Sequence, residues 1–153
     1  MDLILWRHAE AQDPEGDMID FDRALTRRGE KQAARMAAWL DRQLPEGTRI
    51  LASPAVRTQQ TVRVLDRKHK LHDELRPGAS VDALLQLAGW PDAKSPVLVV
   101  GHNPTLGDTV GRLLGLPDSE AAFKKGAVWW LRSRLRDGVQ QTVVITVQSP
   151  ELL

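Results

Sequence analysis

Arginine, histidine and asparagine side chains follow the ends of three short apolar segments in the sequence. Directly after these segments, or a few residues later, stand Arg7 and His8, Arg57, and His102 and Asn103. Guanidinium groups bind phosphoryl oxygens through paired hydrogen bonds, and imidazole gains or loses a proton near neutral pH. Brought together, these residue types would hold an anion and also attack it, which is the chemistry of phosphoryl transfer.

The apolar segments themselves have the composition of buried β-strands. Leu3–Trp6 and Val97–Val100 are continuous apolar runs, and Arg49–Ala52 is a further short segment of this kind. Continuous runs are typical of strands that are buried on both faces of a largely parallel sheet. Because the carboxyl ends of parallel strands lie at one edge of the sheet, we expect the reactive side chains to meet there.

Helical patterns and capping signals occupy the segments between these strands. Apolar residues recur every three or four positions over 27–43, and Thr26 is the expected N-cap of that helix. Ser53-Pro54 and Asn103-Pro104 each predict the start of another helix, as a capping residue followed by proline. Ser80 is expected to cap a shorter helix. The helices that begin after strands would direct their N-terminal N–H groups at the same sheet edge.

The C-terminal part of the sequence predicts a β-hairpin. Val128–Leu131 and Thr142–Val147 are strand-like, and Asp137-Gly138 between them favours a tight turn. Strands that alternate with helices, followed by a hairpin, predict a three-layer α/β/α sandwich with a mostly parallel sheet and an antiparallel C-terminal element. The length of 153 residues fits one domain over 1–153.

Two charged segments lack any helical or strand period. Ala9–Leu25 and Asp66–Gly78 are both polar and irregular. Loops of this length in compact domains are usually functional or disordered, so each segment is either part of a site or solvated surface.

The composition excludes several kinds of site and of partner. The chain has no cysteine, which excludes disulfides, thiolate metal sites and a cysteine nucleophile. The net charge of +1 gives no general attraction to nucleic acid or to an anionic membrane. The apolar runs are far shorter than the ~20 residues that a membrane span needs. We therefore expect a cytoplasmic protein with no nucleic-acid or membrane partner.

Four sequence motifs together resemble the histidine phosphatase superfamily. They are Leu5-Trp6-Arg7-His8-Ala9-Glu10, the segment from Asp20 through Arg23-Ala24-Leu25-Thr26 to Gly29, Ser53-Pro54 with Arg57-Thr58 and Thr61, and Gly101-His102-Asn103-Pro104. Within the superfamily, the chain is most similar to the small SixA-type protein phosphohistidine phosphatases. The resemblance extends from Leu3 to about Ser149, and it implies a histidine phosphatase-like fold.

The resemblance implies a role for each of the residues at the strand ends. His8 would attack phosphorus and carry the phosphoryl group as a transient phosphohistidine. The phosphoryl oxygens would be bound by Arg7, Arg57, His102 and Asn103. No metal and no cofactor is implied, because several cationic donors can stabilise the phosphoryl charge without one.

For three further residues the sequence leaves two alternative roles open. Glu74 stands where the superfamily often places an acidic proton donor, and it is either that donor or a solvated carboxylate. If the leaving group is an imidazole, which is easily protonated, a strong acid matters less than it does for an alkoxide. Asp20 and Arg23 belong to the SixA-type pattern in the long loop, where they either anchor the loop beside the pocket or contact substrate.

The resemblance predicts a phosphatase that removes the phosphoryl group from phosphohistidine in a partner protein. A short chain leaves little room for a segment that covers the pocket, and this favours a protein substrate. One alternative is a phosphomonoesterase for a small metabolite, and the other is a phospho-binding module without catalysis. A binding module needs no nucleophile, so the presence of His8 argues against it. The sequence leaves the oligomeric state undetermined.

Overall fold

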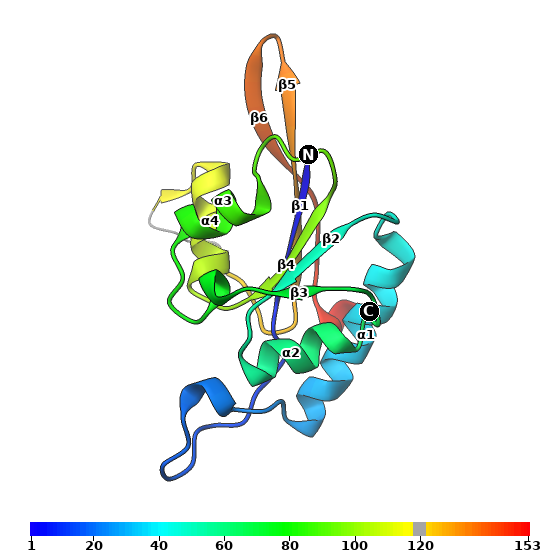
Figure 1. The fold of residues 1–153 in the computed structure, drawn as a ribbon. Helices are drawn as coiled ribbons and strands as arrows, with labels where there is room; N and C mark the ends of the chain where they lie inside the picture. Colours follow the sequence, from blue (N-terminus) through cyan, green and yellow to red (C-terminus); the bar gives the residue numbers. More distant parts are fainter. Residues whose placement is uncertain (118–121) are drawn as a thin grey trace.

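The strands expected from the apolar segments lie side by side in the middle of one sheet. In the computed structural model, which describes residues 1–117 and 122–153, the strand order is β3-β2-β4-β1-β5-β6 (Figure 1). Neighbouring strands are parallel from β3 to β1, whereas β5 and β6 are antiparallel. The bounds are β1 (Asp2–Arg7), β2 (Arg49–Ala52), β3 (Lys70–Leu71), β4 (Val97–Gly101), β5 (Val128–Arg136) and β6 (Val139–Gln148). The mixed sheet with its C-terminal hairpin confirms the predicted fold class.

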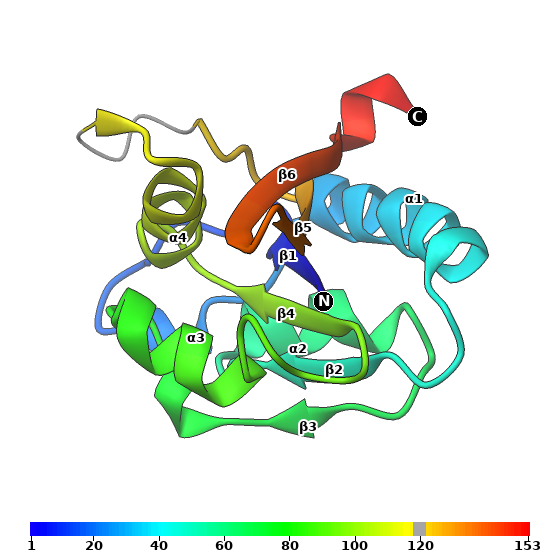
Figure 2. The same cartoon turned by 90° about the horizontal axis from the view of Figure 1, so that it is seen from above.

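Helices cover both faces of the sheet and complete three layers. They are α1 (Arg27–Gln43), α2 (Val56–Arg63), α3 (Val81–Ala88) and α4 (Thr105–Leu114), with short 3-10 turns η1 (Asp20–Asp22), η2 (Asp73–Leu75) and η4 (Pro150–Leu152). Figure 2 shows α1 and α2 on one side of the sheet and α3 and α4 on the other. Among the described residues, none of the helices combines the length and the apolar composition needed to cross a membrane.

Alternate residues of the central strands face the two helical layers. Ile4 and Trp6 of β1 pack in the core formed with α1 and α2. Leu3 and Leu5 pack in the core formed with α3 and α4. All of them are fully buried, which explains why this strand is a continuous apolar run rather than an alternating one.

The strand register brings the predicted reactive positions to one edge. Arg7 of β1 is opposite Gly101 of β4, and Ala52 of β2 is opposite Val100 of β4. The residues that follow the strands, among them His8, therefore leave the sheet at the same level. This arrangement confirms the expectation that the three strand ends meet.

The capping predictions are confirmed for two helices and need correction for the others. Thr26 accepts a hydrogen bond from the backbone N–H of Gly29, and Ser80 caps α3 in the same way. The prediction that Ser53 caps α2 is wrong, because this helix begins only at Val56 and has no side-chain cap. α4 begins at Thr105, one residue later than expected, although the Asn103 side chain does accept from a backbone N–H of its first turn.

The two irregular segments are mostly loop in the structure. Ala9–Leu25 contains η1 and is closed at its ends by a bridge between Ala11 and Leu25. Asp66–Gly78 contains η2 and also the short strand β3, which was not predicted. Both residues of β3 are exposed, so this strand has no apolar pattern that could indicate it.

Gly29 in the first turn of α1 packs directly on the loop that follows β1. A Cβ atom at this position would lie 1.9 Å from the backbone oxygen of Glu10. Alanine is a better helix former than glycine by about 1 kcal/mol, so helix propensity alone predicts that Gly29→Ala stabilises the protein. Because the backbone oxygen cannot move freely, we expect the opposite: a loss of about 3 kcal/mol in the free energy of unfolding, measured by denaturant titration.

The exposed Lys31 in the same helix provides the control for this experiment. Lys31→Ala should change the free energy of unfolding by less than about 0.5 kcal/mol. A Gly29→Ala variant as stable as the wild type would show that the contact between α1 and Glu10 does not constrain the loop.

Candidate active site

The arginine and histidine side chains at the strand ends surround one small cavity of about 180 Å³, here called the His8 cavity. The rings of His8 and His102 have centroids 5.3 Å apart, and Arg57 Nε lies 3.3 Å from His8 Nε2. The predicted residues that line the cavity are Arg7, His8, Arg23, Arg57, His102 and Asn103. The structure therefore brings together groups from β1, α2 and the start of α4, as well as from the long loop.

The hydrogen bonds of His8 define which of its ring nitrogens carries the proton. His8 Nδ1 lies 2.7 Å from the carbonyl oxygen of Ala9. A carbonyl oxygen can only accept, so Nδ1 carries the hydrogen and Nε2 keeps its lone pair. The backbone of His8 is held as well, by hydrogen bonds to Gly101 and from Gly126. The imidazole is thus presented as a neutral base with Nε2 directed at Arg57.

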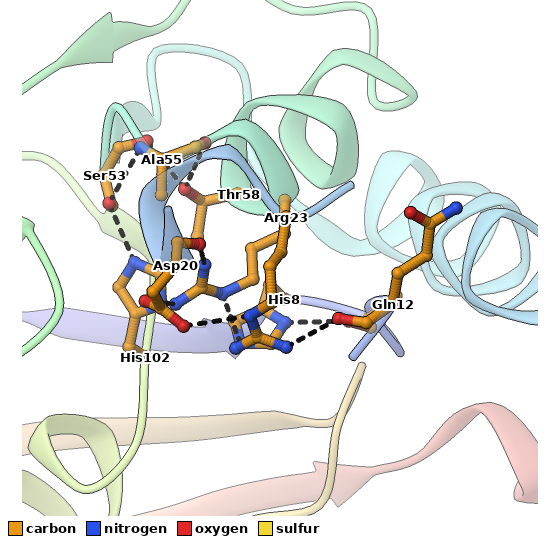
Figure 3. A network of polar contacts seen from close by, with 10 residues as sticks. His8, Gln12, Asp20, Arg23, Ser53, Ala55, Thr58 and His102 are labelled. Carbon is orange, nitrogen blue, oxygen red and sulfur yellow. Dashed lines mark hydrogen bonds and ion pairs between the residues drawn. The ribbon is translucent and has the colours of Figure 1, made fainter. Parts of the chain in front are cut away.

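Arg57 joins the long loop to the His8 cavity. Its guanidinium donates from Nη1 to the backbone oxygen of Asp20 at 2.8 Å and from Nη2 to the Asp20 carboxylate at 3.1 Å. The same carboxylate accepts from Arg23 Nε at 2.9 Å, and Arg23 Nη1 donates to the backbone oxygen of Gln12 (Figure 3). Asp20 and Arg23 therefore lie at the site, where they hold the loop against Arg57.

His102 is oriented by Ser53, a residue of the third motif whose predicted role was to cap a helix. His102 Nε2 lies 2.8 Å from the Ser53 hydroxyl, which also accepts from the backbone N–H of Ala55 (Figure 3). Among the described residues, Nε2 is the acceptor available for the hydroxyl hydrogen. That arrangement leaves the proton of His102 on Nδ1, a buried atom without a hydrogen-bond partner in the described chain. A free N–H of this kind can donate to an anion.

Arg7 and Asn103 are held by one backbone carbonyl. Arg7 Nη1 donates to the oxygen of Phe123 at 2.7 Å, and Asn103 Nδ2 donates to the same oxygen at 3.2 Å. Arg7 and Arg57 both line the His8 cavity, in which an anion would sit.

Burial keeps both histidines of the cavity neutral. It lowers the pKa of His8 to about 3 against the opposing effect of the Ala9 hydrogen bond, and the charges of Arg57 and Arg7 add to the decrease. Burial also lowers the pKa of His102 to about 3, with smaller contributions from His8 and Arg57. Burial lowers the pKa values of Arg7 and Arg57 too, but a guanidinium group stays charged at neutral pH.

Glu74 does not line the His8 cavity. Its carboxylate lies 3.5 Å from His72 Nδ1, and the side chain is 57% exposed. The cavity instead contains residues that sequence reasoning did not select, namely Ala11, Asp13, Pro77 and Lys125. Ala11, Asp13 and Pro77 lie in the two irregular segments, whereas Lys125 belongs to a pair of lysines before a glycine.

A larger cavity, of about 880 Å³, lies between β2 and the segment that leads to β3. It is lined by Thr48, Ile50, Lys68 and neighbouring residues, and it contains none of the residues at the strand ends. Volume alone therefore does not locate the chemistry. Among the described residues, no three histidine, aspartate or glutamate side chains are grouped as a metal site would require.

Comparison with known proteins places the chain in a superfamily. The sequence model of the histidine phosphatase superfamily (branch 1) matches residues 3–80. A phosphohistidine phosphatase SixA homolog of Haemophilus influenzae is 32% identical over 133 residues, which cover 75% of this chain and 78% of the relative.

Solved structures resemble the whole of the fold. A protein of Agrobacterium tumefaciens, whose proposed identity is phosphohistidine phosphatase SixA, superposes with a TM-score of 0.82 at 27% identity and covers 97% of each chain. The protein histidine phosphatase SixA complexed with tungstate gives a TM-score of 0.76 at 26% identity and covers 99% of each chain.

The two buried histidines predict that the protein loses stability in acid. The ordinary pKa of histidine is 6.5, whereas the pKa of both residues in the folded protein is about 3. Between these pH values each of the two histidines is protonated in the unfolded chain and neutral in the folded chain. The free energy of unfolding should therefore fall as the pH is lowered through this range, by about 2 kcal/mol per histidine between pH 7 and pH 5. Denaturant titrations at these two pH values measure the loss.

A His8→Gln variant removes one of the two titrating groups. The difference between its stability at pH 7 and at pH 5 should be smaller than that of the wild type by about 2 kcal/mol, whatever its absolute stability. An unchanged difference would mean that His8 is not neutral in the folded protein.

Proposed function

The chain belongs to the histidine phosphatase superfamily and is a phosphatase, and we propose that it removes phosphoryl groups from phosphohistidine in proteins through a covalent intermediate on His8. The observation that carries this proposal is the state of His8. The contact with the Ala9 carbonyl places the ring proton on Nδ1, and the unprotonated Nε2 accepts a hydrogen bond of 3.3 Å from Arg57 Nε, which the phosphoryl group would replace. A neutral imidazole held in this way is both a nucleophile and a later leaving group.

In the first step, the lone pair of His8 Nε2 forms a bond to phosphorus while the bond from phosphorus to the substrate nitrogen breaks. The departing imidazole of the substrate takes a proton from solvent. The His8 ring, now bonded at Nε2 and protonated at Nδ1, carries positive charge, which the Ala9 carbonyl stabilises through the hydrogen bond. The Ala9 contact thus becomes stronger as the reaction proceeds.

Cationic and neutral donors surround the place that the phosphoryl oxygens would occupy. Arg7 and Arg57 supply guanidinium groups, and His102 lines the same cavity as a neutral imidazole. Donors that are fixed before the reaction stabilise the spreading negative charge of the transition state without reorganisation. In the second step, water attacks phosphorus, the bond to Nε2 breaks, and the lone pair returns to His8.

The size of the His8 cavity and the named relatives support a phosphorylated protein side chain as substrate. A cavity of about 180 Å³ is small, so most of a protein substrate would lie outside it. The relative from Haemophilus influenzae and the two SixA structures compared above carry the names of protein histidine phosphatases. The position of Glu74 outside the cavity agrees with a leaving group that needs no strong acid.

Brief incubation with a phosphohistidine-containing protein should transfer the phosphoryl group to the enzyme. We expect an adduct that is labile in acid and stable in base, and His8→Ala should abolish it because this substitution removes the imidazole that carries the phosphoryl group. His69→Ala, a histidine outside the His8 cavity, should retain the adduct. Rapid quench with intact-mass detection measures it.

Three outcomes would contradict the proposal. Turnover without an adduct would exclude the covalent mechanism. A kcat/KM that is much higher on a panel of sugar phosphates than on the phosphohistidine protein would identify a metabolite phosphomonoesterase instead. Saturable binding of the phosphoprotein without phosphate release would identify a binding module.

The positions of Arg57 and Glu74 predict unequal losses of activity. Arg57→Ala removes a buried donor next to His8 and should lower kcat by on the order of 10²–10³ on a phosphohistidine substrate. Glu74→Gln, outside the cavity, should lower kcat by less than about threefold. Arg63→Ala, an exposed arginine of the same helix, is the control for the loss of a positive charge. Equal losses for Arg57→Ala and Glu74→Gln would make Glu74 an essential acid.

A further inference from the structure

A tight turn over Lys124–Ala127 reaches the His8 cavity from the segment before β5. The turn is closed by a hydrogen bond from the backbone N–H of Ala127 to the oxygen of Lys124 at 3.1 Å. Gly126, the third residue of the turn, has φ of +75°, which is the conformation that a type II turn requires there. Lys125 is thus the second residue of a well-defined turn.

This turn is attached to the strand that carries the nucleophile. The backbone N–H of Gly126 donates to the oxygen of His8 at 3.0 Å, and the N–H of Arg7 donates to the oxygen of Ala127 at 3.1 Å. The indole N–H of Trp6, which is fully buried, donates to the oxygen of Gly126. The backbone of Lys125 therefore has a fixed position relative to His8.

The two lysines of the turn have different surroundings. Lys125 lines the His8 cavity, and Lys124 does not. The pKa of Glu151 lies below its ordinary value, first because of a backbone hydrogen bond and then because of Ser149, with a further contribution from the charge of Lys124. The charge of Lys124 therefore interacts with Glu151 in the C-terminal segment, whereas Lys125 lies at the cavity.

Lys125 differs from the other cations of the cavity in its exposure. Arg57 is 3% exposed and Arg7 is half-buried, whereas Lys125 is exposed to solvent while it lines the cavity. It therefore stands at the rim, where a substrate group outside the phosphoryl position would pass. A lysine ammonium is a point charge on a flexible stem, which suits a single carboxylate. Asp13 also lines the cavity, and its carboxylate repels an acidic group on its own side.

We propose that Lys125 forms a second anionic subsite at the rim of the His8 cavity, which binds the carboxylate of an acidic residue next to the phosphorylated histidine of the substrate. This inference rests on the proposed function, because it takes the phosphorylated side chain to enter the cavity. The subsite makes the enzyme selective for phosphohistidine in an acidic sequence context. The Lys125 subsite affects the choice of substrate rather than the binding of the phosphoryl group, because Arg57 and other residues inside the cavity bind the phosphoryl oxygens.

The test compares two phosphohistidine peptides that differ only in a glutamate or a glutamine beside the phosphohistidine. The readout is the ratio of kcat/KM for the acidic peptide to that for the neutral one. The wild type should favour the acidic peptide by about fivefold, which is the upper end for a solvent-exposed ion pair. The ratio should fall to about one in Lys125→Ala and below one in Lys125→Glu, mainly through KM. Lys124→Ala, the same residue type one position away, should keep the wild-type ratio.

Several outcomes would overturn the subsite. A wild-type ratio of one would do so, and so would an equal loss for both peptides in Lys125→Ala, which would place the ammonium on the phosphoryl group itself. If neither peptide is hydrolysed, the proposed function fails. The ratio of kcat/KM for 4-carboxyphenyl phosphate to that for phenyl phosphate then tests the Lys125 subsite without a phosphohistidine substrate. Thermal unfolding of each variant separates a change in the subsite from a change in folding.

Discussion

The hydrogen bond between His8 Nδ1 and the carbonyl oxygen of Ala9 determines what the cavity can do. It fixes the proton on Nδ1 and leaves Nε2 unprotonated, so that Nε2 accepts a hydrogen bond from Arg57 Nε at 3.3 Å. Burial and the nearby arginines lower the pKa of this ring to about 3, so the lone pair is available throughout the physiological pH range. In the proposed mechanism the same carbonyl stabilises the charge on the phosphorylated ring. One short contact therefore serves both the nucleophile and the intermediate.

The rest of the structure serves to place cations around this imidazole. The register of β1, β2 and β4 brings the strand ends to one level, and the helix after β2 carries Arg57 to within 3.3 Å of His8. The long loop is held to Arg57 by Asp20, and the turn before β5 is held to β1 by backbone hydrogen bonds. These contacts explain how a chain with a net charge of +1 can maintain a strongly cationic cavity.

The sequence predicts the central elements well because their signals are local. β2 and α1 have the predicted bounds, since continuous apolar runs and a threonine cap depend only on neighbouring residues. The strand-end rule brings Arg7, His8 and His102 to one cavity. Contacts between distant segments leave no such pattern: Ser53 has the signature of a cap but orients His102, and Lys125 is distinguished from Lys124 only by the folded turn. Glu74 matches a motif position, yet its carboxylate lies beside His72.

The tautomer of His8 is the central claim, and nitrogen NMR of the free enzyme with labelled histidine tests it most directly. We predict that at pH 7 the His8 ring carries its proton on Nδ1, that Nε2 is unprotonated, and that both signals stay in place when the pH is lowered to 5. A ring that is protonated on both nitrogens at pH 7, or that carries its single proton on Nε2, would contradict the account, because neither form could attack phosphorus from the cavity side.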